Sequence, residues 1–202
     1  MKFVKRVLWP LLFIAALAPF LWLVFLAVGD GLGPDPASEL MHFTGEWALY
    51  LLIFTLCLSP LRRLGVWTSA LRYRRMMGLY AFFYGSLHLL GFAQIYVGWS
   101  GALIAEELLE RPYILAGFLA WLLMVPLAIT STRGWQRRIG RRWMTLHKLV
   151  YPAVIAGVVH VFWQARSDIG EALLYASLVA ALLLYRLVKR TRLESRRRAQ
   201  TA

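Results

Sequence analysis

Carboxylates and cysteines are scarce in this chain of 202 residues, which has ten Asp and Glu side chains and one cysteine, Cys57. One cysteine can form neither an intrachain disulfide nor a thiolate metal site, and its apolar neighbours predict a small buried hydrophobe. Only 16% of the residues are charged and 60% are hydrophobic, which excludes an ordinary soluble domain. The net charge of +13 does not indicate nucleic acid, because the basic residues match no nucleic-acid-binding motif.

Long apolar runs are abundant, and each is near the roughly 20 residues that cross a bilayer as a helix. They predict an all-α integral membrane protein, a single domain 1–202 that forms a bundle of six transmembrane helices. We expect spans at about 7–28, 43–61, 76–97, 112–130, 144–164 and 171–188, followed by a basic tail, 189–202. The first run is too long for the apolar region of a signal peptide and is expected to remain as a helix. An acidic segment around Glu106 is expected to form an interfacial half-helix, and a turn at Asp168 to precede the last span.

The charges divide between the two sides of this bundle. One side holds 21 of the 23 Lys and Arg residues, and the other holds Arg111 and Arg166. Nine of the ten acids lie on or near that second side, with Glu194 as the exception. Because basic loops stay in the cytoplasm, both termini are predicted to be cytoplasmic, in a multi-pass protein of the bacterial inner membrane that contacts membrane lipid.

Histidines in the spans are the candidate functional residues, since an ionisable group inside a bilayer is costly and usually functional. His88 lies 13 residues beyond Arg75, or about 20 Å along the third span. His160 lies 13 residues beyond His147, which is near the cytoplasmic mouth of the fifth span. His88 and His160 should therefore lie at one level in the periplasmic half. We predict that they bind the iron of a b haem from opposite faces.

His147 lies closer to the cytoplasm, and its level partner on the third span is near Arg74. An arginine stays protonated and is no ordinary haem ligand, but it could pair with a haem propionate. A second haem would therefore use His147 and a partner from elsewhere. On an ideal helix His160 lies about 140° around from His147, and Pro152 and Gly157 between them are where a kink could change the phase.

Other roles are open for these residues. The histidines could serve only as interhelical hydrogen-bonding groups. His42, at the start of the second span, is expected to be an interfacial polar residue. The aromatic residues near the outer boundary are expected to form an ordinary aromatic belt; they are Trp47, Tyr96, Trp99 and Trp163.

Several stretches resemble a known family. The segment 143–151, WMTLHKLVY, with His160 and Trp163 after it, is similar to the fifth helix of the ferric reductase-like transmembrane domain superfamily. Further stretches are PFLWL at 19–23, GLGPDP at 31–36, HFTG at 42–45, RRMMGL at 74–79, RPY at 111–113 and TST at 130–132. With His88, they resemble the haem-binding membrane subunit of the bacterial periplasmic protein-methionine-sulfoxide reductase system, over nearly the whole chain.

The resemblance implies a function in electron transfer. Members of this family pass electrons from the quinone pool to a periplasmic molybdopterin catalytic subunit, which reduces methionine sulfoxide in oxidised proteins. The resemblance also implies b haem and FMN, and it places His88, His147 and His160 on the family's histidines. The oxidase relatives have a fourth histidine where this chain has Arg74, so a second haem here would lack one of its two histidine ligands.

The electron donor is expected to be a separate molecule. Oxidase relatives carry a flavin and nicotinamide domain after the last helix, whereas residues 191–202 contain no glycine-rich phosphate loop. A quinol or a flavin reductase would then feed an electron-transfer subunit that is not itself catalytic. One alternative is a self-contained ferric or oxygen reductase fed by a cytosolic flavoprotein. Another is a non-haem transporter or assembly protein, which would purify colourless.

Overall fold

A computed structural model describes the backbone of residues 2–165 and 169–201, and the side chains of residues 7–165, 169–189 and 191. Arg166 and Asp168 lie outside the described residues. The described residues form helices and no strand, which confirms the all-α prediction. The helices are α1 (Lys2–Val28), α2 (Pro36–Arg63), η1 (Ala70–Arg72), α3 (Arg74–Ile95), α4 (Gly101–Glu110), α5 (Pro112–Ile129), α6 (Arg133–Ile139), α7 (Arg142–Leu146), η2 (His147–Leu149), α8 (Val150–Gln164) and α9 (Ile169–Thr201).

Six segments of the described chain are long and apolar enough to cross a membrane, as predicted. The second begins earlier than expected, at Pro36, because Asp35 caps it: its Oδ1 accepts a hydrogen bond from the Ser38 amide at 3.1 Å. Proline at the first helical position has no amide to leave unpaired there. The third ends at Ile95 instead of 97, before a turn in which Trp99 has φ of 62°.

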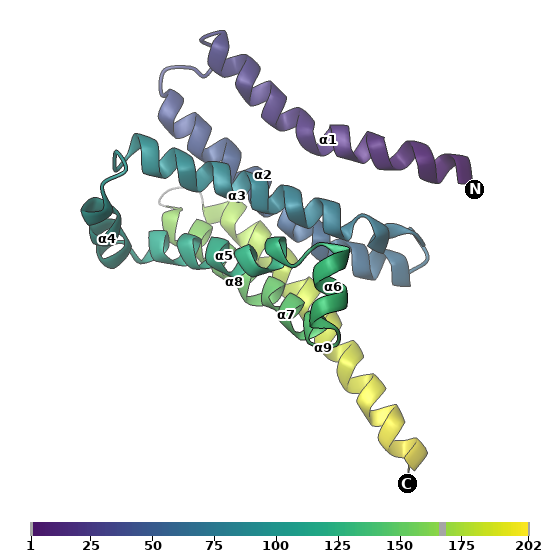
Figure 1. The fold of residues 1–202 in the computed structure, drawn as a ribbon. Helices are drawn as coiled ribbons and strands as arrows, with labels where there is room; N and C mark the ends of the chain where they lie inside the picture. Colours follow the sequence, from purple (N-terminus) through teal and green to yellow (C-terminus); the bar gives the residue numbers. More distant parts are fainter. Residues whose placement is uncertain (1, 166–168, 202) are drawn as a thin grey trace.

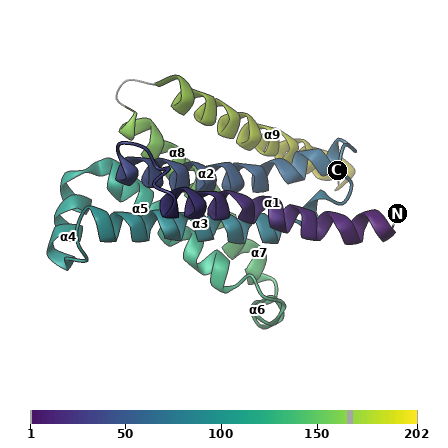
Figure 2. The ribbon, with the colours of Figure 1, turned by 90° about the horizontal axis from the view of Figure 1, so that it is seen from above.

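The two ends of the bundle differ in charge. We call the end with the 29–35 loop and α4 the acidic end, and the end with the 64–73 and 130–141 loops the basic end. Figure 1 shows α4 as a short helix turned across the acidic end. It spans ten residues, and none of its side chains is buried. The expected half-helix is therefore present. At the opposite end, Figure 2 shows α6 and α7 projecting from the bundle.

The fifth span is interrupted near its basic end. It consists of α7, the 3-10 turn η2 that begins at His147, and α8, which begins at Val150. Pro152 therefore lies in the first turn of α8, where the backbone amides have no partner within the helix. The helix is interrupted at residues 147–149, whereas α8 is continuous through Pro152 and Gly157, where the sequence suggested that a kink could lie.

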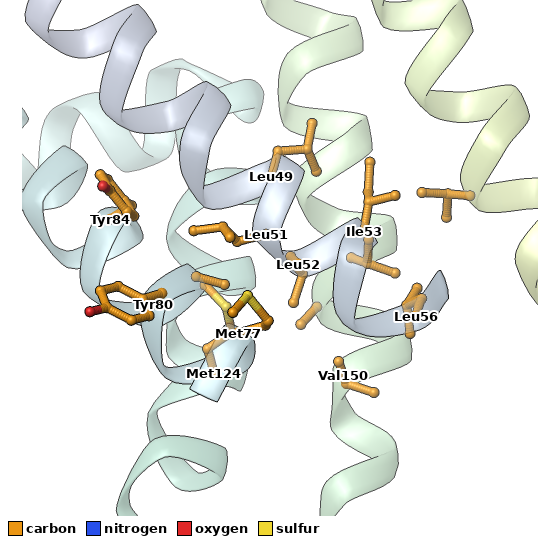
Figure 3. Packing of buried hydrophobic residues seen from close by; sticks show 14 of the residues in the cluster. Leu49, Leu51, Leu52, Ile53, Leu56, Met77, Tyr80, Tyr84, Met124 and Val150 are labelled. Carbon is orange, nitrogen blue, oxygen red and sulfur yellow. The ribbon is translucent and has the colours of Figure 1, made fainter. Parts of the chain in front are cut away.

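The hydrophobic core is built around α2. Leu49, Leu52 and Leu56 of α2 belong to a buried cluster that also contains residues of α1, α3, α5, α8 and α9, and Figure 3 shows part of it. Leu56 and Leu58 are completely buried, as is Tyr84 of α3. Burial of such side chains inside the bundle fixes how α2, α3, α5 and α8 pack, while their outer faces remain available to lipid.

Helix α1 lies along one side of α2 and α3 (Figure 2) and is mostly exposed. It contains Pro19, and the Tyr84 hydroxyl enters its backbone one residue later. That hydroxyl accepts a hydrogen bond from the Phe20 amide and donates one to the Ala16 carbonyl, both at 2.9 Å. A side chain inserted in this way replaces one bond of the helical ladder and holds α1 against α3.

Candidate functional site

His88 of α3 and His160 of α8 face each other at one level of the bundle. Their ring centres are 6.0 Å apart and the ring planes make an angle of 84°. A metal–imidazole bond is about 2 Å long, so two rings on opposite sides of one metal have centres separated by roughly 6 Å. The depth calculation from the sequence therefore placed these two rings at one level, and their separation would suit two histidines that hold one iron.

In each of the two rings, Nδ1 is hydrogen-bonded to a backbone carbonyl oxygen. The Nδ1 of His88 lies 3.0 Å from the Met41 carbonyl oxygen, and that of His160 lies 2.6 Å from the Tyr113 carbonyl oxygen. A carbonyl only accepts, so each Nδ1 carries the proton. The Nε2 atoms then keep their lone pairs, which is the tautomer that a metal requires. Such carbonyl partners orient metal-binding histidines.

Two glycines let the rings lie against neighbouring helices. A Cβ at Gly117 of α5 would be 2.7 Å from His160 Nδ1, and a Cβ at Gly45 of α2 would be 3.0 Å from His88 Cε1. Both distances are shorter than ordinary van der Waals contact. Any larger residue at Gly117 would push the His160 ring away from the Tyr113 carbonyl.

A cavity of about 760 Å³ at the acidic end is lined by both histidines. This volume is within the roughly 300–1,000 Å³ that is usual for cofactor sites. Gly85 and Gly157 lie three residues before His88 and His160 and line the same cavity. The absence of side chains there lets a flat ligand approach two helix backbones. The donor set, the tautomers and the space all fit a bis-histidine haem.

His147 and Arg74 lie together at the basic end, as expected from their depth. Both line a second cavity of about 430 Å³. The His147 ring stacks on Trp143 with ring centres 3.8 Å apart, and its Nδ1 is 3.2 Å from the Trp143 carbonyl oxygen. No second histidine lines this cavity among the described residues. The structure therefore brings one imidazole and one guanidinium to this level.

Leu52 and Met124 line both cavities and separate them. Figure 3 shows their side chains between α2 and α5. These two side chains form an apolar partition, because neither offers water a strong hydrogen-bonding group.

Comparison with known proteins gives a consistent result. The family described as ferric reductase like transmembrane component matches residues 44–158. A protein-methionine-sulfoxide reductase heme-binding subunit MsrQ from Xanthomonas axonopodis pv. citri is 48% identical over 182 residues, covering 87% of this chain and 84% of the relative. MsrQ from Xanthomonas campestris pv. campestris (strain 8004) is 49% identical, covering 88% and 81%, and MsrQ from Rhodospirillum rubrum is 43% identical, covering 89% and 87%.

This chain belongs to the MsrQ family of ferric reductase-like transmembrane proteins. The resemblance stated from the sequence motifs is therefore confirmed. No solved structure matches the chain at a significant level.

Other expected residues of this MsrQ family member lie where their sequence positions suggested, with one exception. His42 is exposed near the start of α2, and its Nδ1 is 2.8 Å from the Ser38 carbonyl oxygen. Tyr96, Trp99 and Trp163 are each more than half exposed, as an aromatic belt requires. The expectation was wrong for Trp47, which packs against the core, with its ring centre 6.2 Å from that of Tyr84.

The structure also shows polar residues that the sequence did not single out. A chain of side chains links Glu46 and Tyr50 of α2 to Tyr175 and Glu171 of α9. The two tyrosine hydroxyls are 2.9 Å apart, Tyr50 is 3.4 Å from the Glu46 carboxylate, and Tyr175 donates to Glu171. At the basic end, Arg186 of α9 contacts Tyr151. Tyr50 and Tyr175 are 125 residues apart in sequence, and Tyr151 and Arg186 are 35 residues apart. No local sequence motif could therefore predict these contacts.

Proposed function

We propose that this chain is the haem-binding, electron-transferring membrane subunit of a methionine-sulfoxide reductase system. In this proposal His88 and His160 bind the iron of a b haem from opposite faces. Their facing rings, with both Nδ1 atoms bound to carbonyls, carry the proposal. The MsrQ relatives, whose name describes them as heme-binding subunits, support it. A bound haem would supply one-electron reduction and oxidation.

The protein residues then act on orientation and solvent. The carbonyls of Met41 and Tyr113 hold the two imidazoles in the ligating tautomer and make them better donors. Gly45 and Gly117 let those rings lie close to α2 and α5. The lining is mixed: Leu49, Leu52 and Met124 would lower the dielectric constant on one side of the metal, while Glu46 and Glu171 line the same cavity, and both would tune the redox potential.

A second haem is proposed for the basic end, with His147 as ligand and Arg74 pairing with a propionate. FMN is the other cofactor that the family resemblance suggests. His147 and Arg74 line the 430 Å³ cavity, which is the space available for the second haem or for FMN. The apolar partition of Leu52 and Met124 would then lie between the two redox sites.

The proposed direction of transfer rests on the charges. The basic loops support a cytoplasmic basic end, and the chain would lie in the inner membrane of a bacterium. Electrons would enter from a quinol of the respiratory pool or a flavin reductase. They would leave at the acidic end for a periplasmic molybdopterin methionine-sulfoxide reductase, the catalytic subunit that repairs oxidised proteins.

Haem analysis of the purified chain tests this proposal. The reduced protein should show a b-haem spectrum, and His88→Ala and His160→Ala should each remove most of the acidic-end haem. His42 lines the same cavity, but its Nδ1 is 2.8 Å from the Ser38 carbonyl oxygen of its own helix. His42→Ala is therefore the comparison that removes a histidine not proposed as a ligand, and it should keep the full spectrum. Full haem content in both ligand variants would contradict the assignment. Turnover of ferric iron or oxygen without any periplasmic partner would instead favour a self-contained reductase.

A further inference from the structure

Two carboxylates line the acidic-end cavity together with the facing histidines. Glu46 comes from α2 and Glu171 from α9. Glu46 follows Gly45, where a Cβ would be 3.0 Å from the His88 ring, so the backbone of Glu46 lies near the level of the histidine pair. Neither Lys nor Arg lines this cavity among the described residues. The two carboxylates therefore face the cavity without a basic partner to offset their charge.

Two tyrosine hydroxyls connect these carboxylates across α2 and α9. The Glu46 carboxylate is 3.4 Å from the Tyr50 hydroxyl, and that hydroxyl is 2.9 Å from the hydroxyl of Tyr175. Tyr175 in turn donates to Glu171. Tyr175 is buried, Tyr50 and Glu46 are half-buried, and Glu171 is exposed. The row therefore leads from a carboxylate in contact with solvent to one inside the bundle.

The row has fewer protons than hydrogen-bonded pairs. Each hydroxyl has one proton to donate, and an ionised carboxylate only accepts. The Tyr175 proton is used on Glu171, so the pair of hydroxyls takes its proton from Tyr50. No proton then remains for the pair formed by Tyr50 and Glu46, whose oxygens are the farthest apart at 3.4 Å. A proton on Glu46 would supply the missing donor, so the row as a whole has room for one more proton.

The other titratable groups around Glu46 have different partners. The remaining ones that line the cavity are His42 of α2, His88 of α3, Tyr113 of α5 and His160 of α8, and Glu39 of α2 acts on Glu46 through its charge. The Nδ1 atoms of His88 and His160 bind carbonyls, and His42 binds its own helix. No hydrogen bond joins these groups to the carboxyl–tyrosine row within the described part of the chain. The row is thus a separate place for a proton in this cavity.

We propose that Glu46, linked to Glu171 through Tyr50 and Tyr175, binds a proton when the acidic-end haem is reduced. This inference rests on the proposed electron-transfer function. One electron converts Fe(III) to Fe(II) and adds one negative charge to the cavity. One proton from the surrounding water adds to a Glu46 carboxylate oxygen and returns the total charge to its former value. Such compensation is favourable because charges interact more strongly in a protein interior than in water.

The test is the midpoint potential of the haem in the purified full-length chain, measured over a series of pH values. Uptake of one proton per electron changes the reduction equilibrium tenfold per pH unit, which corresponds to about 59 mV. Glu46→Gln supplies an amide donor to Tyr50 and cannot titrate. Glu46→Asp keeps an acid at that position. Glu106→Gln is the matched control, because Glu106 is an exposed acid of α4.

We expect the potential of the parent to fall as the pH rises, with a slope that approaches one proton per electron. Glu46→Gln should remove the slope without altering the reduced haem spectrum, and Tyr175→Phe, which interrupts the row, should lower it. Glu46→Asp and Glu106→Gln should keep it. A parental slope in Glu46→Gln would overturn the proposal, because the proton would then bind another group, such as a haem propionate. A parent chain with haem and a flat profile would also overturn it and leave the proposed function standing, whereas a colourless chain would overturn both.

Discussion

Replacing Gly117 by alanine tests the hydrogen bond between His160 Nδ1 and the Tyr113 carbonyl while the proposed haem ligand, His160, is kept. The new Cβ would lie 2.7 Å from His160 Nδ1 and 3.0 Å from its Cε1. Ordinary contacts begin near 3.5 Å, so the ring must move by roughly 0.5–1 Å. A movement of that size away from the Tyr113 carbonyl stretches the 2.6 Å bond from Nδ1 to about 3.1–3.6 Å, which weakens or breaks it.

The magnitude follows from three effects. Loss of the hydrogen bond costs about 1 kcal/mol, and overpacking costs about 1–3 kcal/mol. Alanine is the better helix former by roughly 1 kcal/mol, which offsets part of this. The net cost of about 1–3 kcal/mol corresponds to a roughly 5- to 150-fold weaker haem affinity if it falls on the bound state.

The assay is the rate of haem transfer from the reduced and oxidised protein to an excess of apomyoglobin. Gly117→Ala should release the acidic-end haem faster than the parent, and Gly45→Ala should do so by a smaller factor, because its closest contact is 3.0 Å. Gly101→Ala is the control, since a Cβ there meets nothing within 4 Å. A parental spectrum and release rate for Gly117→Ala would refute the claim that His160 is held in place between α5 and the Tyr113 carbonyl.

Two further substitutions test the rest of the bundle. Tyr84→Phe removes the hydroxyl between the Phe20 amide and the Ala16 carbonyl, so we expect a loss of about 1–3 kcal/mol and a lower thermal midpoint with an unchanged haem spectrum; an unchanged midpoint would show that α1 does not depend on it. His147→Ala should affect a second haem or electron entry more than the acidic-end haem. Loss of all haem in that variant would contradict the assignment of His88 and His160 to a separate site.

Depth along the membrane could be predicted from sequence because helical rise is constant. Counting residues from Arg75 to His88 and from His147 to His160 placed two imidazoles at one level, and the structure brings their rings 6.0 Å apart. The sequence gives His147 and His160 different phases on an ideal helix, and the structure interrupts the helix between them at residues 147–149. A break of this kind depends on how α7 and α8 pack, so counting residues could not locate it.

The amino-acid sequence alone determined the number of spans, their alternation and the side on which basic residues gather, because bilayer thickness and charge impose those features on any chain. Only the tertiary structure decided which backbone carbonyls bind the two imidazoles, those of Met41 and Tyr113. It also decided that the His160 ring lies against Gly117 and that Arg186 contacts Tyr151. Those features join helices distant in sequence, and a backbone carbonyl carries no residue identity that a sequence could reveal. The level of each histidine was thus readable in advance, whereas the orientation of its ring was set by packing.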